Sequence, residues 1–98
     1  MTELTPTSSF SLTLRVQVPN RPGMLAAVIS AISSAGGSMG QIDLIEQTRH
    51  VSIRDITVDC TSTEHAERLV EIVKALPESK VVNVYDRTFN LHRGGKIS

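Results

Sequence analysis

The sequence predicts an α+β fold in which a four-stranded antiparallel sheet carries two helices on one face. Apolar residues recur at every second position in some segments and at every third or fourth position in two others. These are the periods of half-buried strands and of amphipathic helices. The segments follow the order strand, helix, strand, strand, helix, strand. Two right-handed crossovers in this order place both helices on one side of the sheet, which is the ferredoxin-like βαββαβ sandwich.

The first strand is expected from Phe10 to Val18, where every even position is apolar. Such alternation is typical of a strand with one buried face. The opposite face then carries only polar side chains, and we expect it to be open in an isolated domain. These side chains are Ser11, Thr13, Arg15 and Gln17.

A short turn leads from this strand into the first helix. Asn20 can offer a side-chain oxygen to the helix's free N–H groups, Pro22 suits a first helical turn, and Gly23 permits close approach of another backbone or a ligand. The helix is expected over about residues 22 to 35, ended by a left-handed cap at Gly36-Gly37. Its apolar stripe consists of Leu25, Val28, Ile29 and Ile32.

The two middle strands are expected over about residues 38 to 48 and 50 to 60, joined by a hairpin turn at Arg49-His50. In the second of them the apolar pattern slips by one position, since Val51 and Ile53 share one parity and the later apolar residues share the other. A β-bulge at Arg54-Asp55 would return both groups to one buried face.

The second helix is expected to begin with a capping box of Thr61 and Glu64 and to stop before Pro77. The fourth strand is expected over about residues 80 to 91. We therefore expect one domain over residues 10–91, a flexible lead-in over residues 1–9, and a linker over residues 92–98 that leads towards a missing catalytic region.

The composition limits the classes of function. The chain has 98 residues, and its ten basic and ten acidic residues balance, which argues against a nucleic-acid partner. No run is apolar enough to span a membrane and no signal peptide is visible, so we expect a cytoplasmic protein without a membrane partner. The single cysteine, Cys60, fits a reducing compartment, and we expect it to pack as a small apolar residue.

Catalytic and metal-binding patterns are missing from the sequence. The histidines His50, His65 and His92 do not have the spacing of metal ligands, and no nucleophile motif is present. The glycine pair before Lys96 lacks the remaining positions of a phosphate loop. We expect no catalytic residue, no metal site and no cofactor in this chain.

The candidate ligand site is the turn between the first strand and the first helix. A helix N-terminus with open N–H donors favours a carboxylate or another anion, although the same residues would also make an ordinary strand-to-helix connection. The segment Gly36-Gly37-Ser38-Met39-Gly40 either only ends the first helix or leaves room for a ligand or a second subunit's backbone. The predicted ligand-binding residues, from the same or a partner subunit, are Asn20, Arg21, Pro22, Gly23, Met24, Leu25, Ser38, Met39, Gly40 and Gln41.

The run Asn20-Arg21-Pro22-Gly23-Met24-Leu25, followed by Ala35-Gly36-Gly37-Ser38 and set in a βαββαβ order, resembles the ACT domain. The resemblance covers about residues 10 to 91. It implies a regulatory module that binds an amino acid at a subunit interface and forms homo-oligomers. It also implies that Asn20 contacts the ligand's amino group and that the backbone of residues 21–25 binds its carboxylate. Val18 and Ser38 stand where some amino-acid-binding members carry histidine and asparagine.

Further segments look like the N-terminal ACT region of bacterial malic enzymes. These segments are residues 40–46, 51–58 and 85–92, with Gly94-Gly95-Lys96-Ile97 after them. The resemblance implies a missing catalytic region that decarboxylates malate oxidatively with NAD(P) and a divalent metal. The leading hypothesis is an effector-binding domain that regulates this malate oxidoreductase. The alternatives are a structural module that only dimerises the enzyme, and a free-standing carrier or metal-binding domain.

Overall fold

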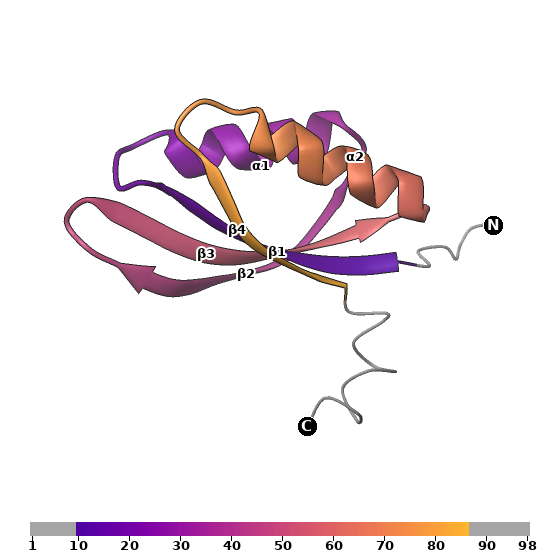
Figure 1. Cartoon of the computed structure of the whole chain (residues 1–98), viewed down its shortest axis with the longest axis horizontal. Helices are drawn as coiled ribbons and strands as arrows, with labels where there is room; N and C mark the ends of the chain where they lie inside the picture. Colours follow the sequence, from indigo (N-terminus) through magenta and orange to yellow (C-terminus); the bar gives the residue numbers. More distant parts are fainter. Residues whose placement is uncertain (1–9, 87–98) are drawn as a thin grey trace, which may run out of the picture.

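The computed structural model describes residues 10–86, which form four strands and two helices in the expected order (Figure 1). The elements are β1 (Phe10–Pro19), α1 (Met24–Ser34), β2 (Ser38–Gln47), β3 (Val51–Cys60), α2 (Thr63–Lys74) and β4 (Lys80–Asp86). The sheet has the antiparallel order β2-β3-β1-β4, and both helices cover one of its faces. The predicted α+β fold is confirmed. Residues 87–91 of the expected fourth strand, together with the expected lead-in and linker, lie outside the described residues.

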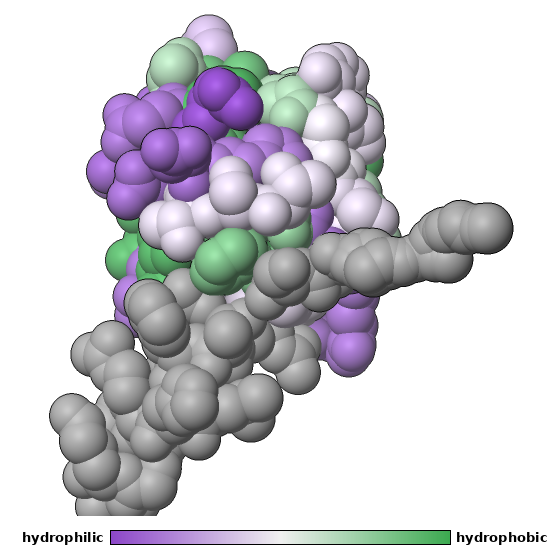
Figure 2. Space-filling model, turned by 90° about the vertical axis from the view of Figure 1, so that its right-hand side faces the viewer, coloured by the Kyte–Doolittle hydropathy of each residue, from purple (hydrophilic) through white to green (hydrophobic). Residues whose placement is uncertain are grey.

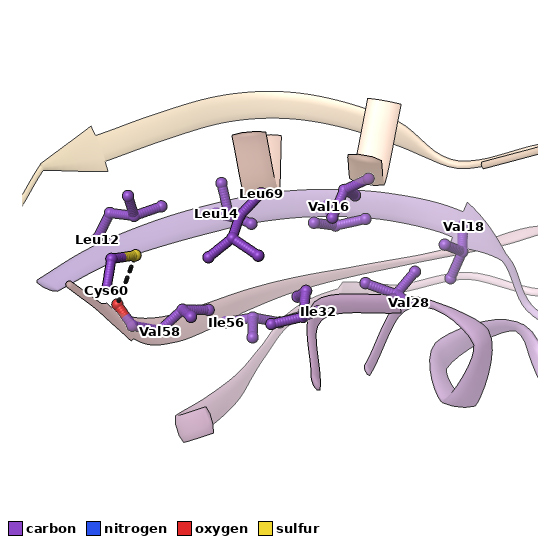
Figure 3. Close-up of a cluster of buried hydrophobic side chains, with 11 residues drawn as sticks. Leu12, Leu14, Val16, Val18, Val28, Ile32, Ile56, Val58, Cys60 and Leu69 are labelled. Atoms are coloured by element: carbon purple, nitrogen blue, oxygen red, sulfur yellow. Dashed lines mark hydrogen bonds between the residues drawn. The ribbon is translucent and has the colours of Figure 1, made fainter. Parts of the chain in front are cut away.

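The core lies between the helices and the sheet. The four even-numbered apolar residues of β1, from Leu12 to Val18, are each at most 4% exposed. Figure 3 shows Val28 of α1 near Val18, and Ile32 of the same helix beside Ile56 of β3. Burial of such side chains is the main favourable term in folding. Cys60 is buried in this cluster, as expected for a small apolar residue.

The register of β3 corrects the expected bulge. β1 and β3 pair continuously from Phe10 opposite Cys60 to Pro19 opposite Val51. Arg54 and Asp55 therefore point to opposite faces, and the expectation of a bulge between them is wrong. The irregularities lie instead at the two edges of the sheet: in β2 between Met39 and Ile42 and between Leu44 and Glu46, and in the pairing of β4 with β1 beside Arg15 and Val16. A bulge in central β3 would disturb two ladders, whereas an edge strand has only one to disturb.

The end of α1 has the predicted left-handed cap. Gly36 has a φ of 89°, its N–H donates to the Ser33 carbonyl at 3.0 Å, and the Gly37 N–H donates to the Ile32 carbonyl at 3.0 Å. This pair of bonds is a Schellman motif. A Cβ on Gly37 would lie 2.7 Å from Cγ2 of Ile32 and 2.8 Å from Cγ1 of Val58. The chain thus passes directly from the helix onto the sheet with no room for a side chain.

The start of α2 is shifted by one residue from the predicted capping box. Ser62, not Thr61, caps the helix, and its Oγ accepts the His65 N–H at 3.0 Å. The Thr61 N–H donates instead to Nδ1 of His65 at 3.1 Å. Nε2 therefore carries the ring proton and donates it to the Ala35 carbonyl at 2.8 Å. This buried imidazole thus joins α1 to the start of α2.

The face of β1 away from the helices is polar, as predicted. Arg15 of β1 forms two hydrogen bonds with Asp55 of β3, at 2.8 and 2.9 Å. The hydrogen bond to Asp55 raises the pKa of Arg15. The guanidinium carbon also lies 5.6 Å from the centre of the Tyr85 ring. A cation and a carboxylate thus neutralise each other at the middle of this face.

Candidate functional site

Three connections meet at one end of the molecule: the turn between β1 and α1, the hairpin between β2 and β3, and the loop between α2 and β4 (Figure 1). The Asn20 N–H donates to the His50 carbonyl at 3.0 Å. The Asn20 side-chain nitrogen donates to the Thr48 carbonyl at 2.7 Å. On the other side of the turn, Arg21 forms an ion pair with Glu78. The candidate turn is therefore held from both neighbouring connections.

The expectation that Asn20 caps α1 is wrong. The N-cap is Gly23, which has a φ of 88°, and no side chain bonds to this end of the helix. Pro22 precedes the cap, so Met24 is the first helical residue. Asn20 lies three residues before the cap, and its side chain bonds the hairpin instead. This leaves its Oδ1 atom without a hydrogen-bond donor among residues 10–86.

The beginning of α1 offers open backbone donors. Met24 and Ala27 donate their N–H groups to the carbonyls of Arg21 and Gly23, at 3.3 and 3.0 Å. The N–H groups of Leu25 and Ala26 have no acceptor within the described part of the chain. A Cβ built on Gly23 would meet no atom within 4 Å. The turn thus presents the free N–H groups of Leu25 and Ala26 and the free Oδ1 of Asn20 beside open space, at the positive end of a helix.

The second predicted group of ligand residues lies far from the turn in one chain. Ser38 pairs with Asp59, at the end of the sheet where β1 begins, whereas Gln47 pairs with Ser52, at the end where the turn lies. The nine residue steps from Ser38 to Gln47 correspond to about 30 Å of strand. One chain therefore brings together the predicted residues 20–25, while Ser38, Met39, Gly40 and Gln41 lie at the opposite end.

Two polar residues near the turn were not predicted as site residues. Ser52 pairs with Val18 on the helix-facing side of the sheet, is 3% exposed, and has a hydroxyl without a partner among residues 10–86. Arg54, two residues along β3, has a buried Nε atom that also has no partner in this part of the chain. The sequence did contain a signal for them, because even-numbered positions of this strand face the helices. The expected bulge hid this signal, since it turned the apolar residues at positions 51 and 53 towards the helices instead.

Other parts of the described chain are less suited to an acid ligand. A groove of about 230 Å³ lies between α2 and the strands β1 and β4. Its walls include Leu12, Val70 and Val84, and Glu67 adds a negative charge, which disfavours a carboxylate. Figure 2 views the end away from the turn, where hydrophobic and hydrophilic residues are mixed. Within residues 10–86, no cluster of histidine, cysteine or acidic side chains could hold a metal ion, and no helix has the length and hydrophobicity to cross a membrane.

The fold and the turn can now be compared with known proteins. The family model of the ACT domain matches residues 12–78. The chain belongs to the ACT domain family. An ACT domain is a regulatory ligand-binding domain, and the βαββαβ order with its open first turn is its framework here.

Curated relatives of this ACT domain are malic enzymes. The chain is 36% identical over 90 residues to the NAD-dependent malic enzyme of Geobacillus stearothermophilus, an alignment that covers 92% of the chain and 19% of the relative. It is 33% identical over 86 residues to NAD-dependent malic enzyme 1 of Bacillus subtilis (strain 168), which covers 87% of the chain and 20% of the relative. The chain thus spans about a fifth of the length of the curated relatives it matches.

Solved structures share the fold. The ACT domain from GTP pyrophosphokinase of Chlorobium tepidum superposes with a TM-score of 0.63 at 14% identity, covering 79% of this chain and 96% of that one. The ligand-free regulatory subunit of aspartate kinase from Thermus thermophilus gives a TM-score of 0.53 at 18% identity, covering 69% and 43%. At these identities the likeness concerns the fold alone.

Proposed function

We propose that this ACT domain binds a small amino or carboxylic acid at the turn between β1 and α1 and so regulates a linked malic enzyme. The observation that carries the proposal is the pair of free N–H groups, on Leu25 and Ala26, beside open space at the start of α1. A carboxylate there accepts both hydrogen bonds and lies at the positive end of the helix dipole. The free Oδ1 atom of Asn20 accepts a hydrogen bond from the ligand's amino group or hydroxyl.

A second copy of the chain would complete this site. The edge strand β2 exposes Ile42, Leu44 and Ile45, between 37% and 54% of each, and an exposed apolar edge favours pairing with another strand. Antiparallel pairing of two β2 edges about a twofold axis brings residues 38–41 of the partner to the turn of the first copy. The two groups of predicted ligand residues then face each other across the interface.

Regulation follows if the ligand favours one arrangement of subunits over another. A ligand with equal affinity for both arrangements shifts neither. Because the proposed site includes both copies, a bound acid would stabilise the arrangement in which the two edges pair. The enzymatic step, with NAD(P) and a divalent metal, would belong to a region beyond this chain, as the similarity to malic enzymes suggests.

The proposal is tested by a thermal-shift screen of the twenty amino acids and common dicarboxylates. A ligand at 100 times its Kd adds about 2.7 kcal/mol to the free energy of unfolding, so the midpoint rises. Gly23→Asn is the matched variant, because asparagine tolerates a left-handed backbone while its side chain fills the open space. We expect the positive φ at this position to lower the unliganded midpoint by a few degrees and the ligand-induced shift to disappear. An unchanged shift in this variant would exclude the turn as the site.

A second candidate function is dimerisation without ligand binding. The exposed apolar residues of β2 favour this alternative by themselves. It predicts no thermal shift with any acid on the panel, together with a concentration-dependent dimer in sedimentation velocity. A saturable shift with any member of the panel would rule it out.

A further inference from the structure

Arg54 is a cation with no anionic partner among the described residues. It lies on the helix-facing side of β3, between Val16 of β1 and Leu44 of β2. The neighbouring acids Asp55 and Asp43 occupy opposite positions of the β2–β3 ladder and point to the other face of the sheet. Arg15 forms an ion pair with Asp55 there. Among residues 10–86 no carboxylate forms an ion pair with Arg54, although its Nε atom is buried.

Ser52, two positions before Arg54 on the same side of β3, is a second buried group that lacks a hydrogen-bond partner among residues 10–86. Its side chain is almost fully buried, and its hydroxyl has no partner. Buried polar atoms are nearly always hydrogen-bonded, so two unpaired ones at positions i and i+2 of one strand need an explanation. Both can donate a hydrogen bond, and one belongs to a positive group. A group that accepts hydrogen bonds from both of them should be an anion with more than one acceptor oxygen, and a carboxylate has these properties.

Ser52 and Arg54 lie on the part of β3 that runs towards the proposed ligand site. Ser52 pairs with Val18, two residues before Asn20, and Arg54 pairs with Val16. Four residues of strand span about 13 Å, and the long arginine side chain reaches over part of that distance. Figure 3 places Val28, from the first half of α1, near Val18. Leu44, which pairs with Arg54, is 54% exposed on the strand whose edge would pair with a second copy, so Arg54 lies beside the proposed interface.

We propose that the effector is a short dicarboxylic acid and that Arg54 and Ser52 bind its second carboxylate. This inference rests on the proposed function, since the first carboxylate occupies the N–H groups of Leu25 and Ala26. The guanidinium of Arg54 donates charged hydrogen bonds to this carboxylate, and the Ser52 hydroxyl donates a further one. The site thereby selects acids with two carboxylates over their amides and over apolar amino acids. A plain dicarboxylate and an acidic amino acid share this chemistry.

The test compares acids with their near-isosteric amides by calorimetric titration of the full chain. L-aspartate is compared with L-asparagine, and succinate with succinamate. A hydrogen-bonded charge contributes enough for the acids to bind at least about tenfold more tightly than the amides. Preference for aspartate over succinate identifies an amino acid as the effector, and the reverse identifies a plain dicarboxylate; either result supports the second-carboxylate site.

Variants assign the preference to individual residues. Arg54→Gln should reduce the tenfold preference to about equal binding, whereas Arg54→Lys should keep part of it because the charge remains. Ser52→Ala removes a hydroxyl that has no partner, so it should leave the thermal midpoint unchanged and weaken acid binding several-fold. Arg68→Gln, an exposed arginine of α2, is the matched control and should bind like the original chain.

The outcomes separate this inference from the proposed function. If acids and amides bind equally, or if Arg54→Gln and Ser52→Ala both keep the full preference, the second-carboxylate site is wrong while binding at the turn stands. If none of the four probes and no other acid on the panel binds, the proposed function fails and this inference fails with it.

Discussion

His65 joins two elements that the sequence pattern treats as independent. Its ring accepts a hydrogen bond from the Thr61 backbone and donates one to the Ala35 carbonyl, at 3.1 and 2.8 Å. Sequence spacing placed this histidine at a helix start but contained no information about Ala35, which lies thirty residues earlier. The role of a single polar atom depends on tertiary contacts, so periodicity alone does not reveal it.

Replacing His65 by leucine should lower the free energy of unfolding by about 2 to 3 kcal/mol, because two backbone groups lose their partners in a buried place. Urea unfolding monitored by circular dichroism measures this loss. His50→Ala, in the exposed hairpin turn, is the control and should change stability by less than about 0.5 kcal/mol. Equal stability of the two variants would contradict the bridging role of the imidazole.

Gly37 provides a second test at the residue scale. An alanine there would place its Cβ within 2.8 Å of side-chain atoms of Ile32 and Val58, and such overpacking costs about 1 to 3 kcal/mol. Thermal unfolding of Gly37→Ala should therefore show a lower midpoint, whereas Ser34→Ala, an exposed position in the last turn of α1, should not. If the thermal midpoint of Gly37→Ala equalled that of the control, the connection between α1 and β2 would be loosely packed at Gly37.

At the scale of elements, the apolar periods predicted all six segments and their order. They did not predict the edge-strand bulges. The alternation of apolar residues does not show whether an irregularity lies in β2 or in β3, because the same sequence pattern fits both. The structure keeps β3 regular and so turns Ser52 and Arg54 towards the helices. The same ambiguity hid the two residues that we now assign to the ligand's second carboxylate.

The turn between β1 and α1 depends on the hairpin beside it. Asn20→Ala removes the side-chain bond to the Thr48 carbonyl, and we expect a loss of about 1 kcal/mol in stability. Amide hydrogen exchange should accelerate in the turn and in the hairpin more than in α2. Gln47→Ala, exposed at the end of β2, serves as the control. Exchange rates that change only at Asn20 itself would show that the two connections are not coupled.

At the scale of the whole molecule, one chain holds the two groups of predicted ligand residues apart. The turn lies at one end of the sheet and the start of β2 at the other. The sequence predicted both groups of residues, but not their separation, because separation depends on the direction in which β2 runs. The proposed twofold pairing of β2 edges would join them.

Charged substitutions at the two edges of the sheet test this pairing. Leu44→Lys puts a charge on β2, and Val82→Lys puts one on β4, at residues that are 54% and 51% exposed. Sedimentation velocity should show that the β2 variant weakens self-association by about tenfold or more, as expected for a buried unpaired charge, while the β4 variant does not. The opposite pattern would assign the interface to β4.

The central claim is that the turn itself binds an acid, and amide NMR of the labelled chain tests it most directly. Titration with pooled amino acids and dicarboxylates should produce saturable shifts of the Leu25 and Ala26 amides and of the Asn20 side-chain amide. Shifts confined to the groove beside Glu67 and Val84, or no saturable shift at the turn, would contradict the account.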